Sequence, residues 1–382
     1  MTDTKPTHVK PRGVLLVGAF GQRNPGDEAL LASFRRALHD RPLTVASSDP
    51  ARSESMHGIA AVNARSWREV ARAVHRSAAV VMAGGTVFKT LPAETQRHPL
   101  SLLVSALGLS AYARAQGRPV LAVGVGVGRL DTPTAQLLAR KVAAQCDLLV
   151  LRDSTSAHLL AAAGVPAPLR VAADPVWTLF DGVPKPARGD DRVVVVPSRW
   201  AVAEAPGHVE ALADAVQPLL RHGTRVHVQP WQVGGSSGGP DDGAIARHLI
   251  TRLGHGAELL PAPHEVTDAV SALSGARLVI TSRFHAAVAA AAAGTATLVV
   301  AHEAKHTALA EQLDQPATSV WASPAELEAA VSTALGCAPP AAAAVRGEIA
   351  AAAEAFGLLR LMLAEGRQPV EDISGLRLEP AW

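Results

Sequence analysis

The sequence predicts an α/β protein built from two doubly wound, Rossmann-like domains that face each other across a cleft. Three observations support this prediction. Short apolar runs alternate with longer amphipathic stretches, which is the pattern of βαβ units in a parallel sheet covered by helices. The pattern stops at the Pro-, Gly- and charge-rich stretch 181–191 and then restarts. The length of 382 residues also exceeds what one hydrophobic core usually supports.

The first domain is expected to span residues 1–184. G-V-L-L-V-G-A-F (13–20) is typical of a buried strand, and E-A-L-L-A-S-F-R-R-A-L (28–38) of a helix with one apolar face. Further strands are predicted at 43–47, 59–62, 79–82, 120–125, 148–151 and 169–172, with helices at 66–76, 101–116, 133–144 and 154–163.

The second domain is expected to span residues 185–338 and to repeat the pattern, after a linker at 181–191. Its strands are predicted at 193–196, 225–228, 257–260, 277–281, 297–301 and 318–321. The Gly- and Ser-rich segment 234–243 is typical of a flexible surface loop. Residues 339–382 are predicted to form a C-terminal helix, over 341–365, and a tail that docks across the domains.

Composition excludes several classes of protein. Hydrophobic residues make up 48% of the chain, charged residues make up 18%, and the net charge is +2. These values describe a soluble globular protein with no general attraction to nucleic acid, so any anion site has to be local. No signal-peptide core and no apolar run long enough to span a membrane is evident, so a cytoplasmic location is expected. Peripheral contact with a membrane is compatible with this, and the oligomeric state stays open.

The clearest candidate site is T-S-R-F-H (281–285), between a strand and an alanine-rich helix. Ligands of doubly wound sheets bind beyond the carboxyl ends of the strands. Ser282 is a candidate helix cap, Arg283 offers five N–H donors, and His285 falls in the first helical turn, where the helix carries partial positive charge. Small alanines let the helix pack closely behind these side chains.

A second cluster follows the next strand, in A-H-E-A-K-H (301–306), and adds His302, Lys305 and His306. Together the two clusters predict a site that binds a phosphate together with a carboxylate. Zinc is less convincing, because no H-E-x-x-H pattern is present and arginine and lysine beside a cation would be unfavourable. No metal site is therefore predicted.

The first domain offers a different chemistry at its strand ends. In G-A-F-G-Q-R-N-P-G-D-E (18–28), Asp27 and Glu28 at the helix start would repel phosphate, which favours a hydroxyl-bearing substrate; the alternative is that Asp27 only caps the helix. Gly84 and Gly85 either admit another molecule to the backbone or form a plain tight turn.

Two further motifs have simpler explanations. In L-R-D-S-T-S (151–156), a local pair between Arg152 and Asp153 accounts for both residues without a ligand. A-D-P-V-W (173–177) is expected to turn the chain beneath the cleft.

The order of these motifs resembles one known family. N-P-G-D-E-A-L-L, A-G-G-T, R-D-S-T-S, A-D-P, S-R-F-H and A-H-E-A-K, over roughly residues 13–315, are similar to the polysaccharide pyruvyl transferase family. The resemblance implies a GT-B-like fold, phosphoenolpyruvate as donor, and a sugar diol as acceptor that becomes a cyclic pyruvate ketal on a surface or secreted glycan. Two positions depart from the family: it usually has tyrosine at position 302, here His302, and a third glycine at position 83, here Ala83.

The resemblance also assigns roles. Arg283 and His285 match the family's donor-binding and catalytic pair, and Lys305 matches its downstream lysine. We expect His285 to be the general acid, because its ordinary pKa lies near working pH. Asp27 is expected to be the base or a ligand of the acceptor hydroxyl, with Glu28 as second choice. The expected donor site comprises Ser282, Arg283, His285, His302 and Lys305, and the expected acceptor site Asn24, Asp27, Glu28, Gly84 and Gly85.

Phosphoenolpyruvate would be a co-substrate, and no cofactor is expected. The acceptor would be a sugar or a lipid-linked glycan. Two alternatives remain: a GT-B glycosyltransferase that uses a nucleotide sugar, and a non-catalytic member that binds a glycan or an anion.

Overall fold

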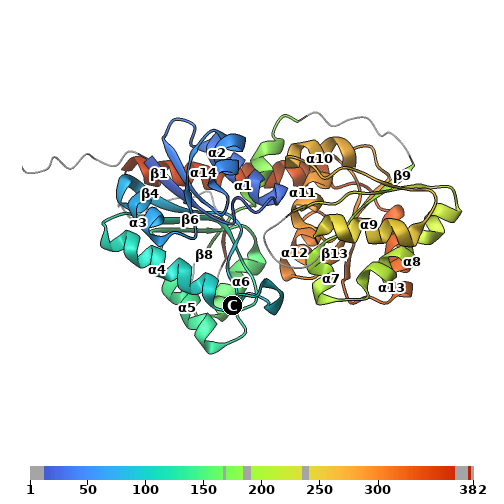
Figure 1. Ribbon diagram of the computed structural model, residues 1–382, viewed down its shortest axis with the longest axis horizontal. Helices are drawn as coiled ribbons and strands as arrows, with labels where there is room; N and C mark the ends of the chain where they lie inside the picture. The colour runs from blue at the N-terminus through green and yellow to red at the C-terminus, as the bar shows by residue number, and fades with distance from the viewer. Residues whose placement is uncertain (1–12, 167–168, 184–190, 235–240, 366–376, 380–382) are drawn as a thin grey trace, which may run out of the picture.

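The computed structural model describes residues 13–166, 169–183, 191–234, 241–365 and 377–379. Figure 1 shows two α/β domains side by side, each with a central sheet covered by helices. The fold class predicted from the sequence is confirmed. The predicted boundary at 184/185 and most of the linker lie outside the described residues, as does 235–240 of the Gly- and Ser-rich loop.

The first domain contains a sheet with the strand order β15-β8-β7-β6-β4-β1-β2-β3, and β5 pairs with β6 beside it. Its strands are β1 (Gly13–Val17), β2 (Leu43–Ser47), β3 (Ala60–Asn63), β4 (Ser77–Ala83), β5 (Thr86–Phe88), β6 (Val120–Val127), β7 (Leu148–Leu151), β8 (Leu169–Val171) and β15 (Arg377–Glu379). Its helices are α1 (Pro25–Ala37), α2 (Pro50–His57), α3 (Trp67–Arg76), η1 (Ala93–Thr95), α4 (Ser101–Ala115), α5 (Pro133–Ala143), α6 (Ser154–Ala162) and η2 (Pro175–Phe180). All pairings except β15 with β8 are parallel.

The second domain has a parallel sheet in the order β11-β10-β9-β12-β13-β14. Its strands are β9 (Arg192–Val196), β10 (Arg225–Val228), β11 (Ala257–Leu259), β12 (Leu278–Thr281), β13 (Thr297–Ala301) and β14 (Ala317–Ser319). Its helices are α7 (Arg199–Glu204), α8 (His208–Arg221), α9 (Asp242–Leu253), α10 (Val266–Leu273), α11 (Phe284–Ala292), α12 (Ala304–Gln312) and α13 (Pro324–Leu335).

The strand orders place the predicted motifs at the two topological switch points. The chain order reverses between β1 and β4 in the first sheet and between β9 and β12 in the second. Ligands of doubly wound sheets bind beyond the carboxyl ends of strands at such points. The segments that follow β1 and β12, 18–24 and 281–285, therefore lie where binding chemistry is expected.

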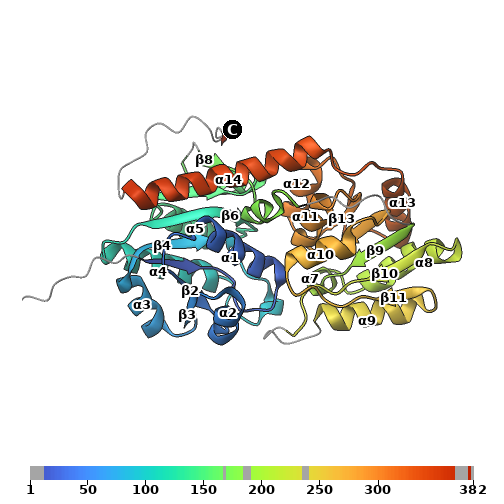
Figure 2. The same ribbon diagram turned by 90° about the horizontal axis from the view of Figure 1, so that it is seen from above.

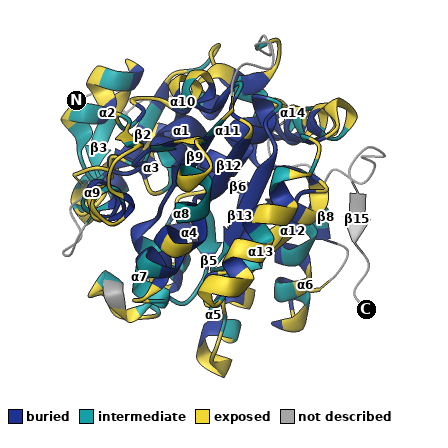
Figure 3. Ribbon diagram, turned by 90° about the vertical axis from the view of Figure 1, so that its right-hand side faces the viewer, coloured by how far each residue is buried: buried dark blue, intermediate teal, exposed yellow. Residues whose placement is uncertain are grey.

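Burial explains why the strands were recognisable. All eight residues of β6 are buried, as are the four of β12. In Figure 3 the central strands are dark blue and the exposed surface lies on the outer helices. Parallel strands covered on both faces form largely apolar runs, and the predicted strands 43–47, 148–151 and 297–301 coincide with β2, β7 and β13. The predicted strand 225–228 coincides with β10, in which buried Val226 and Val228 alternate with Arg225 and His227.

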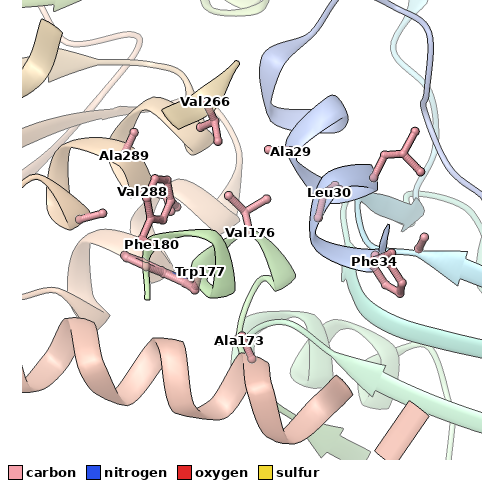
Figure 4. Close-up of a cluster of buried hydrophobic side chains, with 14 of the residues drawn as sticks. Ala29, Leu30, Phe34, Ala173, Val176, Trp177, Phe180, Val266, Val288 and Ala289 are labelled. Carbon is pink, nitrogen blue, oxygen red and sulfur yellow. The ribbon is translucent and has the colours of Figure 1, made fainter. Parts of the chain in front are cut away.

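One hydrophobic cluster joins the domains. It includes Leu30 and Phe34 of α1, Trp177 of η2 and Ala289 of α11. Figure 4 shows η2 between α1 and α11, so the A-D-P-V-W segment lies at the contact between the domains. The alanines of α11 are what allow this close contact, because each is buried and adds only a methyl group.

The C-terminal helix α14 (Ala342–Glu365) returns to the first domain, where it contacts η2, β6 and β7. Figure 2 shows it running along the top of that domain. The rings of Phe34 and Phe356 meet edge to face with centroids 4.9 Å apart. This agrees with the predicted helix at 341–365. None of the described helices has the length and hydropathy required to cross a membrane.

Candidate functional site

The first turn of α1 carries the predicted acceptor residues. Asn24 is the N-cap: its Oδ1 accepts from the Gly26 N–H at 3.2 Å, and its Nδ2 donates to Oδ2 of Asp27 at 2.7 Å. The alternative in which Asp27 caps the helix is therefore wrong. Asn24 holds the carboxylate of Asp27 instead. Burial raises the pKa of Asp27, although nearby His285 and the bond from Asn24 act in the opposite direction.

Glu28 has an internal role. Its Oε1 accepts from the Gly21 N–H at 3.0 Å and its Oε2 lies 2.8 Å from Nε2 of His57. Both Glu28 and His57 are buried. This buried pair ties the loop after β1 to the end of α2, so Glu28 shapes the loop that presents Asp27.

His285 lies where the two domains touch. A β-carbon built on Gly26 would be 2.0 Å from Nδ1 of His285, so the imidazole lies directly against the backbone of α1. The helix α11 can approach this closely only because residue 26 is a glycine. The imidazole predicted to act in a crevice is thus at the domain junction, beside Asp27.

Asp174 connects His285 to the first domain. Its Oδ1 is 3.7 Å from Nε2 of His285, and its Oδ2 accepts from Nη1 of Arg152 at 3.3 Å. Arg152 also bonds Asp153, as the sequence indicated, and Thr86. Burial alone would raise the pKa of Asp174, but His285 and Arg152 outweigh it and hold that pKa below its ordinary value.

Sequence reasoning missed this connection. R-D-S and A-D-P were explained locally, yet Arg152 and Asp174 are both buried and pair across 22 residues. A glycine was the available signal: a β-carbon on Gly126 would lie 2.7 Å from Nε of Arg152, so β6 makes room for the guanidinium. The same guanidinium stacks 4.6 Å from the ring centroid of Phe284 in the other domain.

Arg283 is anchored inside the second domain. Its Nη2 donates to Oδ1 of Asp242, its Nη1 is 3.5 Å from Oε1 of Gln232, and its buried Nε has no partner among the described residues. The predicted cap by Ser282 is wrong, because Arg283 occupies the N-cap position without a side-chain bond. The Oγ of Ser282 is buried and also lacks a partner within the described ranges.

The 301–306 cluster also crosses the junction. Lys305 pairs with Glu303, and Nζ of Lys89 from the first domain lies 3.5 Å from Oε1 of Glu303. Burial would raise the pKa of Glu303, but Lys305 and Lys89 hold it well below its ordinary value. Burial lowers the pKa of Lys305, an effect that Glu303 opposes. Neither Lys89 nor the part played by Glu303 was predicted.

The two histidines of this cluster stack with ring centroids 4.3 Å apart. Burial and the charge of Lys305 lower the pKa of His302 to about 3. Burial, helped by His302, also lowers the pKa of His306 well below its ordinary value. Both rings are therefore neutral near pH 7, which makes His302 a hydrogen-bonding group rather than a cation.

Gly84 and Gly85 end β4 with φ of 67° and 71°, in the left-handed region that favours glycine. A β-carbon on Gly84 would meet the side chain of Leu30 at 2.6 Å, whereas one on Gly85 would meet nothing within 4 Å. Packing explains the first glycine, and only the second has open space beside it. Over the described part of the chain, no group of three His, Cys, Asp or Glu side chains is placed to hold a metal ion.

Comparison with known proteins identifies the family. The sequence model of polysaccharide pyruvyl transferases matches residues 24–303. The chain belongs to the polysaccharide pyruvyl transferase family. Members of this family are transferases of polysaccharide biosynthesis. No curated protein matches the sequence significantly.

Solved structures with a similar fold act on or bind uridine nucleotides. They include the UDP co-structure of S. aureus MnaA (TM-score 0.65, 11% identity, 95% of this chain and 100% of that chain). The UDP-GlcNAc 2-epimerase from Methanocaldococcus jannaschii is another (TM-score 0.61, 9% identity, 91% of this chain and 99% of that chain). A third is Anabaena Alr3699/HepE in complex with UDP-glucose (TM-score 0.58, 16% identity, 93% of this chain and 98% of that chain). At these identities the similarity shows the GT-B-like fold alone.

Proposed function

We propose that this polysaccharide pyruvyl transferase moves the enolpyruvyl group of phosphoenolpyruvate onto two hydroxyls of a sugar and releases phosphate. The product is a cyclic pyruvate ketal. The observation that supports this most directly is the position of His285. Its imidazole touches α1 at Gly26, lies beside Asp27, and has Asp174 at 3.7 Å. The residues proposed as proton donor and base, His285 and Asp27, are therefore close together where the two domains join.

The donor is a small anion, and the junction supplies cations from both domains. Lys89 and Lys305 flank the carboxylate of Glu303, while Asp242 and Gln232 fix Arg283 in place. Each of these cations already has a carboxylate partner. Binding of phosphoenolpyruvate at the lysines is then an exchange of one anion for another, and Arg283 contributes the N–H donors that Asp242 and Gln232 leave free.

His285 is the proposed acid. As an imidazolium it gives a proton to the methylene carbon of phosphoenolpyruvate, which becomes a methyl group and leaves an oxocarbenium-like centre at C2. The ionised Asp174 stabilises the imidazolium before transfer. The neutral rings of His302 and His306 do not compete for that role.

Asp27 is the proposed base. Its raised pKa makes it a better proton acceptor than an exposed aspartate, and Asn24 fixes the orientation of its carboxylate. A sugar hydroxyl loses its proton to Asp27 as its oxygen bonds to C2. The C2–O bond to phosphate then breaks, and the second hydroxyl bonds to C2. Of the two hydroxyl protons, one replaces the proton that His285 gave to the methylene carbon, and the other leaves with the phosphate.

Phosphate release from phosphoenolpyruvate in the presence of candidate glycosides tests the proposal, with the product analysed for the ketal. His285→Ala and Arg283→Ala should each reduce turnover on the order of a hundredfold or more. His255→Ala, at an exposed site away from the junction, is the matched control. Near-normal turnover in both site variants would overturn the assignment.

The proposal assigns no step to a metal or a resident cofactor. A nucleotide-sugar enzyme is the alternative that the fold allows. Thermal stabilisation by a UDP-sugar, without stabilisation by phosphoenolpyruvate, would favour that alternative. Binding of both donor and glycoside without phosphate release would instead indicate a non-catalytic member.

A further inference from the structure

A polar pocket lies between the domains, on the first turn of α1. It has a volume of about 110 Å³ and is lined by Arg23, Pro25, Glu28 and Arg52 from the first domain and by Trp231, Val233, Ala262, Pro263 and His264 from the second. None of these residues belongs to the clusters around Arg283 or Lys305. The pocket and the proposed reaction centre share the helix turn that runs from Pro25 to Glu28, and Gln232, which contacts Arg283, lies between the lining residues Trp231 and Val233.

The pocket carries more positive than negative charge, because two arginines and one carboxylate line it. Among the described residues, neither Arg23 nor Arg52 has an ion pair, and the buried Nε of Arg52 has no hydrogen-bond partner. The carboxylate in the wall belongs to Glu28, and both of its oxygens are already engaged by Gly21 and His57. The exposed Arg23 and the half-buried Arg52 can therefore both donate to an anion that enters the pocket.

The geometry of the loop holds Arg23 over the pocket. Its backbone has φ of 57°, in the left-handed region that a non-glycine residue adopts at a cost. Its Nη1 would lie 3.2 Å from a β-carbon on Gly234, so the guanidinium reaches the opposite domain. Nearby, Nε2 of Gln232 donates to the carbonyl of Gln22 at 2.9 Å. These contacts bring the two arginines of the first domain against the wall of the pocket that the second domain contributes.

Resting on the proposed function, we infer that this pocket binds the phosphate or diphosphate of an acceptor sugar. Arginine pairs with phosphate through two parallel hydrogen bonds, and the apolar walls of Trp231, Pro25 and Pro263 strengthen such bonds by excluding water. With the phosphate on one side of the first turn of α1, the attached sugar extends toward Asp27 on the other. A neutral glycan would supply no charged partner for the buried Nε of Arg52.

Binding of inorganic pyrophosphate, measured by calorimetry with and without saturating phosphoenolpyruvate, tests the pocket. The variant is Arg23→Gln with Arg52→Gln, and the control is Arg68→Gln with Arg72→Gln on the exposed side of α3. Pyrophosphate should still bind when phosphoenolpyruvate is present. Its Kd should rise at least tenfold in the pocket variant and stay unchanged in the control. The single variant Arg23→Glu should show the same loss if the double variant unfolds.

Phosphate-release assays then identify the source of the phosphate. Their acceptors are a hexose 1-phosphate, a UDP-hexose, a prenyl-diphosphate-linked hexose in detergent, and the neutral methyl glycoside of the same sugar. The pocket variant should raise KM for one phosphorylated acceptor at least tenfold and leave KM for phosphoenolpyruvate unchanged. The acceptor whose KM rises most identifies the source of the phosphate.

The failures can be told apart. If phosphoenolpyruvate displaces pyrophosphate, or if the pocket variant turns over the best acceptor normally, the pocket inference is overturned while the proposed function stands. If no acceptor gives phosphate release but pyrophosphate binding still depends on Arg23 and Arg52, the proposed function fails and the phosphate pocket is supported.

Discussion

The imidazole of His285 occupies the space that a side chain on Gly26 would fill. The two residues lie in different domains, one at the start of α11 and the other at the start of α1. The contact aligns the two switch-point loops with each other. The relative position of the proposed acid and base therefore depends on a backbone surface without a β-carbon.

Gly26→Ala should strongly reduce activity without unfolding the protein. The added methyl group would lie 2.0 Å from Nδ1, so the imidazole has to move by more than the roughly 1 Å that catalysis tolerates. Turnover, followed by phosphate release, should fall about a hundredfold. Gly108→Ala in α4 is the control, because nothing lies within 4 Å of the added carbon. Equal activity in the two variants would show that the contact is unimportant.

Asp174→Asn should impair both stability and catalysis. The substitution removes the charge that faces Arg152 and His285, and breaking a buried ion pair costs about 3 kcal/mol. Denaturant unfolding measures the first effect and phosphate release the second. The control is Asp131→Asn, which removes an exposed partner of Arg129 and should cost less than about 1 kcal/mol. A variant with wild-type unfolding and turnover would contradict the role given to Asp174.

The pKa of Asp174 gives this prediction a pH dependence. Its folded value lies below the ordinary 3.8, so its contribution to stability is present above pH 3.8 and is lost as the pH falls through the folded value. The acid limb of the stability curve below about pH 4 should therefore be shallower in Asp174→Asn.

Local patterns were sufficient to predict most of the fold. Buried parallel strands are continuous apolar runs, which is why β2 and β7 were predicted with their observed limits. The short helix α2 and the three-residue strand β5 were missed, since neither is long enough to show a period. Asn24 was not recognised as the cap of α1, and the alternative that Asp27 caps it was wrong, although the proline after Asn24 was a usable signal.

The candidate site was predictable only in part, because its residues interact across long sequence separations. The cations Arg283 and Lys305 stood out at strand ends. The partners of these cations could not be predicted, because Asp242 lies 41 residues from Arg283, and Lys89 reaches Glu303 from the other domain. A motif indicates which residue types meet at a site. Which carboxylate faces which cation is decided by tertiary packing.

His208 should make the protein less stable in acid, independently of the proposed site. Burial lowers its pKa from 6.5 to about 4, and its buried Nε2 has no partner among the described residues. The folded state keeps the ring neutral, so stability is full above pH 6.5 and falls by about 3 kcal/mol as the pH drops through 4. His208→Leu should make the free energy of unfolding depend less on pH in this range, and His255→Leu, at an exposed position, should leave that pH dependence unchanged. Urea unfolding at several pH values measures the free energy of unfolding. The same pH dependence in the wild type and in both leucine variants would contradict the prediction.

Glu303→Gln should tighten the binding of phosphoenolpyruvate. The carboxylate of Glu303 pairs with both Lys89 and Lys305, so phosphoenolpyruvate has to displace another anion to bind these lysines. The amide keeps the shape but removes that competition, and KM for phosphoenolpyruvate should fall roughly tenfold. Loss of Glu303 also removes the interaction that raises the pKa of Lys305, so the gain should shrink as the pH rises. Glu311→Gln, at an exposed position on the same helix, should leave KM unchanged. A KM that rises in Glu303→Gln would mean that the donor binds elsewhere and that Glu303 serves only to hold the domains together.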